Sequence, residues 1–147
     1  MAENIPQNFE NHARVMPAYH YVTFPLLVIN FFFTLYQVVV TNFSADRLMA
    51  CGVAIALVLL FFVARIMALT VQDRVIRLEE RMRMRDLLPA DLQPRVADFT
   101  VKQLVALRFA SDAELPALAR TVLDKKMTDQ KAIKRMVKNW RGDHQRA

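Results

Sequence analysis

Glycine is almost absent from this sequence, which has only Gly52 and Gly142 among its 147 residues. A loop that cradles phosphate groups needs several glycines, because a backbone without side chains can approach the phosphate closely. The sequence has neither a phosphate-binding loop nor a paired-glycine dinucleotide motif. Most kinds of nucleotide-binding loop are therefore excluded.

Cysteine and histidine are also scarce. Cys51 is the single cysteine, so the chain can form no internal disulfide and has no cysteine cluster for zinc or an iron–sulfur centre. His12 and His20 could each offer an imidazole to a metal, but no further group of ligands accompanies them. No serine or cysteine nucleophile stands near a base, and no His–Glu metal motif occurs. We therefore expect a protein that is not an enzyme and has no catalytic residue, metal site or cofactor.

Two long stretches lack charge of either sign. The first, residues 21–40, reads YVTFPLLVINFFFTLYQVVV, and the second, residues 48–64, reads LMACGVAIALVLLFFVA. Twenty helical residues extend about 30 Å, the thickness of the hydrocarbon core of a bilayer. The remaining chain is too short to cover two helices that are apolar on every side. The sequence predicts two transmembrane helices, about 20–40 and 48–68.

The spans are joined by a short polar connection, TNFSADR at residues 41–47, which predicts an antiparallel hairpin. A cleaved signal peptide is disfavoured, because the first run has almost no positive flank and no small-residue cleavage site follows it. Positive charge follows the second span instead, at Arg74, Arg77, Arg81, Arg83 and Arg85. The positive-inside rule therefore predicts a multi-pass protein with both termini in the cytoplasm.

The second span does not stop at the membrane, since neither Gly nor Pro occurs between Val53 and Leu88. We expect one helix from about Ala45 to Leu88, supported by an i,i+4 ion pair between Glu79 and Arg83. Apolar residues recur along it at spacings of three and four, as in a coiled coil, at Ala68, Val71, Val75, Leu78 and Met82. We expect this seam to pack on the protein's own C-terminal tail; the alternative is a second copy of the chain.

The chain is accordingly predicted to be all-α, an integral membrane helix hairpin with a long second helix and a small helical cytoplasmic tail. The predicted parts are an N-terminal cytoplasmic segment at 1–16, the hairpin at 17–70, the helical extension at 71–88, a proline-interrupted linker at 89–99 and the tail at 100–147.

Polar residues of the first span share one helix face, because Asn30, Thr34 and Gln37 are spaced by four and three. Gly52 and Ala56 give the second span a pair of small residues four apart, a spacing that allows helices to approach closely. We expect these two faces to pack against each other. The alternative is a self-assembling hairpin that lines a pore with the polar stripe.

Three residues at the ends of the spans are typical of the headgroup region. Arg65 can lay its aliphatic stem along lipid and hold its guanidinium at the interface. Pairing with a buried group such as Asn30 is the alternative. Tyr19 and His20, just before the first span, are residues suited to the interfacial aromatic belt.

The tail contains three helical signals. Thr100 and Gln103 fit a capping box, and Ser111 and Glu114 fit another, although the following proline favours a helix start near Leu115. A tail of this size forms only a marginal core, so we expect it to lean on the helical extension, the membrane or a partner.

The last predicted helix begins after Thr128 and ends at Gly142. From residue 100 onward the chain has eleven Lys or Arg against five Asp or Glu, a net charge of +6. We expect the apolar face of this helix to complete the core and its polar face to be solvated or to bind anionic lipid headgroups or a partner. The candidate residues are Lys131, Lys134, Arg135, Lys138, Trp140 and Arg141. Nucleic-acid binding is not expected, because there is no recognition-helix motif or aromatic stacking platform.

Four stretches resemble a family of small bacterial membrane proteins of unknown function. They read QNFENHARVMPAYH, ARIMALTVQDRVIRLEE, LVALRFASDAEL and IKRMVKNWRGDHQR. The resemblance covers nearly the whole chain and implies a bacterial inner-membrane location, two spans and a helical cytoplasmic tail. It brings no catalytic residue or ligand.

These observations favour a non-catalytic membrane anchor or accessory subunit, whose tail binds a larger membrane complex or anionic lipid. The alternative from a different class is the self-assembling hairpin that forms a pore or transport element. A membrane protein partner or a homo-oligomer is expected in either case.

Overall fold

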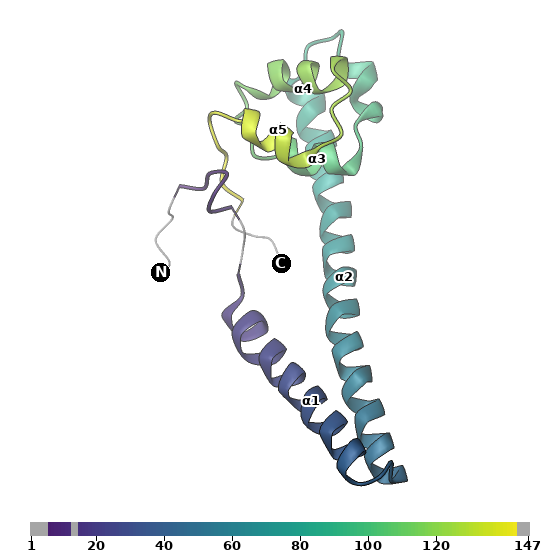
Figure 1. Ribbon diagram of the computed structural model, residues 1–147. Helices are drawn as coiled ribbons and strands as arrows, with labels where there is room; N and C mark the ends of the chain where they lie inside the picture. The colour runs from purple at the N-terminus through teal and green to yellow at the C-terminus, as the bar shows by residue number, and fades with distance from the viewer. Residues whose placement is uncertain (1–5, 13–14, 144–147) are drawn as a thin grey trace. The chain divides into compact units, whose positions relative to one another are not determined.

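The computed structural model describes residues 6–12 and 15–143, and its regular elements are all helical (Figure 1). In order, the elements are η1 (Ala18–Thr23), α1 (Phe24–Val40), α2 (Ala45–Leu87), η2 (Gln93–Asp98), α3 (Val101–Leu107), α4 (Leu115–Asp124) and α5 (Gln130–Met136). The described residues contain no strand beyond one isolated bridge. The all-α prediction is confirmed. Residues 1–5, 13–14 and 144–147 of the predicted terminal segments lie outside the described residues.

Two helical stretches, Ala18–Val40 and Ala45–Leu87, are long and apolar enough to cross a membrane. The chain divides into two compact units, and the division falls inside α2. The apolar unit is Val15–Leu69, and the C-terminal unit comprises the residues from Thr70 onward together with the described residues before Val15. The N-terminal segment therefore belongs with the C-terminal tail.

A tight turn connects α1 to α2. Asn42 and Phe43 have φ of 57° and 64°, the left-handed region that asparagine tolerates and a bulky residue rarely adopts. The turn is held because the Phe43 amide donates to the Val38 carbonyl at 2.9 Å and the Thr41 hydroxyl donates to the Gln37 carbonyl at 2.7 Å. These bonds satisfy carbonyls that the end of a helix leaves open.

The apolar unit packs through a face that the sequence did not indicate. Cys51 and Ala54 are buried, whereas Ala56 is exposed and a Cβ added to Gly52 would meet nothing within 4 Å. The prediction that Gly52 and Ala56 pack against the first span is wrong for a single chain. Each residue turns a helix by about 100°, so Cys51, Ala54 and Phe61 share a face from which Gly52 and Ala56 are rotated away.

The polar stripe of α1, predicted to pack on the second span, is covered only in part: Thr34 and Gln37 are half-buried and Asn30 is exposed. The Thr34 hydroxyl donates to the Asn30 carbonyl at 3.0 Å and thus bonds its own helix.

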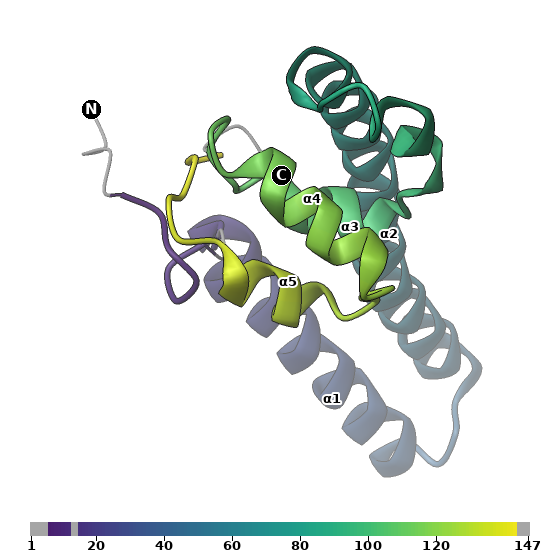
Figure 2. The same cartoon turned by 90° about the horizontal axis from the view of Figure 1, so that it is seen from above.

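The core of the C-terminal unit combines the end of α2 with the helices of the tail. Its buried members include Met84 from α2, Leu104 from α3, Ala119 from α4 and Ile133 from α5. α3 packs against both α4 and α5 (Figure 2). Because Met84 is fully buried in this core, the tail rests on the end of α2, as its small size predicts.

Residues 89–99 are part of the core and do not form a linker. Leu92, Val96 and Phe99 are all buried, and the Gln93 side chain donates to the Arg85 and Leu88 carbonyls at 2.6 and 2.7 Å. The prolines end α2, but one of them fits the first turn of the 3₁₀ helix η2. The linker prediction failed because it was based on the prolines and not on the apolar residues Leu92, Val96 and Phe99 around them.

The ends of α3 and α4 follow the sequence in part. Thr100 and Gln103 form the predicted capping box, with the Thr100 amide donating to Gln103 Oε1 at 2.7 Å. α4 begins at Leu115 without a side-chain cap, so the second capping box, Ser111 with Glu114, is absent. The Glu114 carboxylate accepts from other amides described below.

α5 is shorter than predicted. Its N-cap is Asp129, which accepts from the Lys131 amide at 2.8 Å, and not Thr128. The helix ends at Met136 instead of continuing to Gly142. The Glu114 carboxylate accepts from the Lys138 and Asn139 amides at 2.9 and 3.0 Å. Those amides therefore lie in an extended segment. Continuing α5 through them would break their hydrogen bonds to Glu114.

The extended segment pairs with the residues after α3. The Ser111 amide donates to the Asn139 carbonyl at 3.0 Å, and the Arg141 amide donates to the Phe109 carbonyl at 2.7 Å. These bonds bring Ala110 and Trp140 into the isolated antiparallel bridge.

The predicted seam of α2 does not pack on the tail. Its members within the C-terminal unit are 49–64% exposed: Val71, Val75, Leu78 and Met82. The tail instead covers the opposite face, which carries Ile76, Glu80, Met84 and Leu88, each no more than 5% exposed. The expectation that the seam packs on the tail is therefore wrong.

Candidate functional site

A charged cleft of about 800 Å³ lies in the C-terminal unit. It is lined by Ile76, Glu79, Glu80, Arg83, Asp86, Arg108, Asp112, Arg141, Gly142 and Asp143. Most of these residues carry charge, and both signs are present. None of the cleft residues except Arg141 was a site residue predicted from the sequence.

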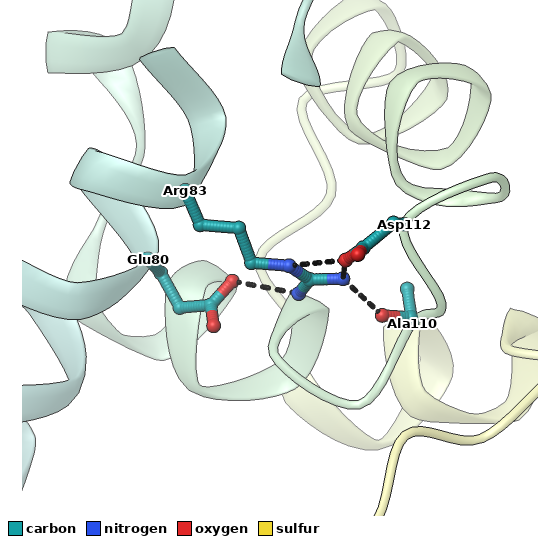
Figure 3. A network of polar contacts seen from close by, with 4 residues as sticks. All are labelled: Glu80, Arg83, Ala110 and Asp112. Atoms are coloured by element: carbon teal, nitrogen blue, oxygen red, sulfur yellow. Dashed lines mark hydrogen bonds and ion pairs between the residues drawn. The ribbon is translucent and has the colours of Figure 1, made fainter. Parts of the chain in front are cut away.

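Arg83 is the centre of the polar contacts beside this cleft (Figure 3). Its Nη1 lies 3.1 Å from Glu80 Oε2, and its Nη2 lies 2.6 Å from Asp112 Oδ1. Nη2 also donates to the Ala110 carbonyl at 2.6 Å. The Arg83 side chain is only 10% exposed, so these bonds form largely out of water. They join α2 to the segment that follows α3.

The ion pair differs from the one predicted. Arg83 pairs with Glu80 three residues before it, whereas the sequence favoured Glu79 four residues before it. Both spacings place side chains near each other on a helix. Glu80 is selected because the tail covers its face and leaves Glu79 exposed.

Burial raises the pKa of the Glu80 carboxyl above its ordinary value of 4.5, and the charge of Arg83 opposes part of this rise. Removing a carboxylate from water disfavours its charged form, while a nearby cation favours it. The desolvation is the larger effect here.

We expect Glu80→Gln to change how the stability of the C-terminal unit depends on pH. Because the pKa of Glu80 is raised in the folded chain, the folded state binds more protons than the unfolded state above pH 4.5. The stability that Glu80 contributes is complete below that pH and is lost as the pH rises through the folded pKa. The variant lacks this loss, so its unfolding free energy relative to the unsubstituted protein should rise over the same window.

Denaturant unfolding of the detergent-solubilised chain, measured from about pH 4 to about pH 8, tests this expectation. The matched control is Glu79→Gln, because Glu79 is exposed on the same turn of α2. The quantity to follow is the unfolding free energy of Glu80→Gln minus that of the unsubstituted protein. If it stays constant or falls as the pH rises, the pKa of Glu80 is not raised in the folded chain.

A second arginine, Arg108, also lines the cleft. Arg108 is 6% exposed, and its Nη1 lies 3.4 Å from Asp143 Oδ2. Its guanidinium carbon lies 4.6 Å from the centre of the Phe109 ring, a cation–π arrangement. The backbone of Asp143 is in turn fixed by Gln7, whose Oε1 accepts from the Asp143 amide at 2.8 Å and whose Nε2 donates to the Asp143 carbonyl at 3.1 Å.

The N-terminal segment docks on an aromatic cluster of the same unit. The His12 ring lies 5.7 Å from both the Phe109 and the Trp140 rings and 5.8 Å from the Phe9 ring. His12 Nδ1 lies 2.7 Å from the Phe9 carbonyl and its Nε2 lies 3.1 Å from Lys134 Nζ. Both contacts form if Nδ1 carries the proton and Nε2 accepts from the lysine. His12 thus links the two ends of the chain.

The residues predicted to bind a partner or headgroups do not form one face. Lys134 bonds His12, and the guanidinium of Arg135 lies 5.1 Å from the Phe9 ring centre. Trp140 is half-buried, donates from Nε1 to the Val137 carbonyl at 3.1 Å and packs against the core. Arg141 lines the cleft. Lys131 and Lys138 are the two of the six that are exposed and outside these arrangements.

The predicted interfacial residues come together in the apolar unit. The Tyr19 ring stacks on Phe61 with 4.0 Å between centroids, and its hydroxyl donates to the Phe61 carbonyl at 3.2 Å. The Arg65 guanidinium carbon lies 5.9 Å from the Tyr19 ring centre, and the His20 ring lies 5.0 Å from it. One end of η1 is thereby tied to α2.

The chemistry of the cleft is that of ion pairing. Within the described residues, no three or more His, Cys, Asp or Glu side chains are grouped to hold a metal ion. Glu80, Asp112 and Asp143 each contact an arginine. Sequence reasoning missed these residues because Arg83 meets Asp112 across 29 positions. The one local signal was the spacing of Glu80 and Arg83.

A protein-family model matches residues 1–147. The chain belongs to DUF6526, a family of unknown function. The resemblance to a family of unknown function, carried by the four stretches quoted above, is confirmed over the whole chain. No curated protein and no solved structure matches the chain significantly.

Proposed function

We propose that this protein is a non-catalytic anchor or accessory subunit of the bacterial cytoplasmic membrane, crossing it twice with both termini in the cytoplasm. Its C-terminal unit binds a larger membrane complex there. The observation that carries the proposal is the docking of residues 6–12 on the C-terminal unit through Gln7, Phe9 and His12. Segments that touch must lie on the same side of a membrane. An even number of crossings then separates them, which agrees with two apolar helices.

The surface of the apolar unit supports insertion into lipid. Large side chains along both helices are exposed, among them Ile29 at 64%, Phe32 at 61% and Leu60 at 61%. Soluble monomers rarely expose contiguous apolar patches of this extent, whereas lipid-facing helices do so throughout. The side of the membrane follows from charge, because the connecting turn offers Arg47 and the extension of α2 offers five arginines.

The cleft supports a binding role over a catalytic one. Its arginines Arg83 and Arg108 are paired with Glu80, Asp112 and Asp143, and these pairs hold α2, the segment after α3 and the C-terminal segment together. From residue 100 onward the chain carries a net charge of +6, and Lys125, Lys126, Lys131 and Lys138 of this region are exposed. Such a surface favours an acidic face of a membrane protein partner, and anionic headgroups supply the same charge.

Native mass spectrometry of the protein extracted gently from its own membranes tests the proposal. We expect foreign subunits to accompany the chain in a fixed ratio, because the proposed role of the C-terminal unit is to bind them. Copies of this chain alone, conducting ions after reconstitution, would favour the pore. A chain that carries only anionic lipid would remove the protein partner from the proposal.

A further inference from the structure

The exposed seam of α2 lies opposite the face that the tail covers. Its members Val71, Val75, Leu78 and Met82 are spaced by four, three and four. Nine helical positions correspond to about two and a half turns, so Val71 stands half a turn from buried Glu80, and Leu78 half a turn from half-buried Leu87. The C-terminal unit therefore leaves this stripe open. A second helix can reach it without displacing the unit's own core.

The spacing of the stripe is that of a two-stranded coiled coil. Val75 and Met82 take the first apolar position of the heptad, and Val71 and Leu78 take the second. Val75 with Leu78 is the combination, a β-branched residue at the first position and leucine at the second, that favours two parallel strands. Arg85 takes the next core position and ends the stripe.

The charges beside the stripe select a parallel second copy. Arg74 and Arg81 occupy the flank that precedes the first apolar position, and Glu79 and Asp86 occupy the flank that follows the second. In a parallel pair, these flanks meet five residues apart, so Arg74 faces Glu79 of the other copy and Arg81 faces Asp86. In an antiparallel pair each flank would meet itself, arginine against arginine and acid against acid.

These flanking groups are placed for such pairing. Arg74, Glu79 and Asp86 are exposed. Arg81 is half-buried, and its Nη2 lies 3.5 Å from the Ala97 carbonyl, so Arg74 and Glu79 carry most of the charge complementarity.

We propose that two copies of the chain pair in parallel through Val71, Val75, Leu78 and Met82, with Arg74 of each copy bonded to Glu79 of the other. The parallel orientation rests on the proposed membrane insertion, because all copies then point the same way. Two heptads are short for a coiled coil in water. Here the helices are already formed, and confinement to one bilayer raises their effective concentration.

Disulfide cross-linking in isolated membranes tests the pairing. In a Cys51→Ser background, Val75→Cys and Leu78→Cys each place a thiol in the seam, where the same residues of two copies come within the distance that a disulfide requires. The matched control is Arg77→Cys, which is exposed on α2 but turned away from the seam. We expect most of the chain to become covalent dimer for the two seam positions, and a small fraction for Arg77→Cys.

Charge reversal tests the register. Adding Arg74→Glu to Leu78→Cys should lower the dimer yield, because the introduced acid meets Glu79 of the other copy. Adding Glu79→Arg as well should restore the yield, because the pair is then reversed in sign. Equal cross-linking at all three cysteine positions, or no restoration by the second change, overturns the inference.

The same membranes separate this inference from the proposed function. A chain that stays in the membrane after alkaline extraction yet does not cross-link at the seam overturns the dimer and leaves the anchor intact. If alkali releases the chain but the seam positions still cross-link, the dimer stands and the proposed membrane anchor is contradicted.

Discussion

Arg83→Ala is expected to destabilise the C-terminal unit by about 3–5 kcal/mol, the cost of removing one partner from a buried ion pair. The substitution leaves Glu80 buried without its nearest cation, and it removes the donor to the Ala110 carbonyl. Asp112 loses the same partner but is 66% exposed along its side chain, so water can replace the arginine there. The expected loss therefore comes mostly from Glu80 and Ala110.

Chemical denaturation in detergent, followed by the fluorescence of the single tryptophan, measures this loss. The control is Arg77→Ala on the exposed side of α2, which should change the unfolding free energy by no more than about 0.5 kcal/mol. Replacing both members, in Glu80→Leu with Arg83→Met, should cost less than the sum of the single changes, since no uncompensated charge stays buried. An Arg83→Ala chain as stable as the Arg77→Ala chain would contradict the role given to this network.

The helices were predictable where local signals agree. α2 has no Gly or Pro between Val53 and its end, and it runs over Ala45–Leu87, one residue short of its expected end. The capping box of Thr100 and Gln103 needs only residues three apart. Composition alone identified the two helices that are able to cross a membrane.

The packing of those helices was not predictable, because periodicity identifies an apolar face but not what covers it. The seam at Val75 and Leu78 was assigned to the tail. The tail covers the face of Glu80 and Arg83 instead, where burial is possible only because Asp112 and Ala110 complete the bonds. From the sequence alone, a helix face that carries two charged residues is expected to be exposed to solvent.

Long-range bonds also decided where the last helix ends. The pattern after Thr128 continues as a two-faced helix through Trp140. The carboxylate of Glu114, which lies 24 positions before Lys138, takes the amides that would continue the helix. The cluster of Phe9, His12 and Trp140 likewise joins residues more than a hundred positions apart. Neither contact leaves a local signal in the sequence.

The membrane topology gives an all-or-none prediction, because a membrane-impermeant thiol reagent labels only groups that face it. In the proposed topology, the contact of Gln7 with Asp143 requires the two ends of the chain to lie on one side of the membrane. The turn between α1 and α2 must then lie on the other side if both helices cross. Single cysteines in a Cys51→Ser background report the two sides separately: Glu10→Cys and Lys125→Cys for the ends, and Asp46→Cys at the start of α2 for the turn beside it, all at exposed positions.

The most direct measurement is the labelling of these three variants in spheroplasts with an impermeant maleimide, before and after lysis, with a permeant maleimide as the control that each thiol reacts. Two crossings with cytoplasmic ends predict that Asp46→Cys is labelled in intact spheroplasts and that Glu10→Cys and Lys125→Cys are labelled only after lysis. Labelling of Glu10→Cys and Lys125→Cys from opposite sides would contradict the account.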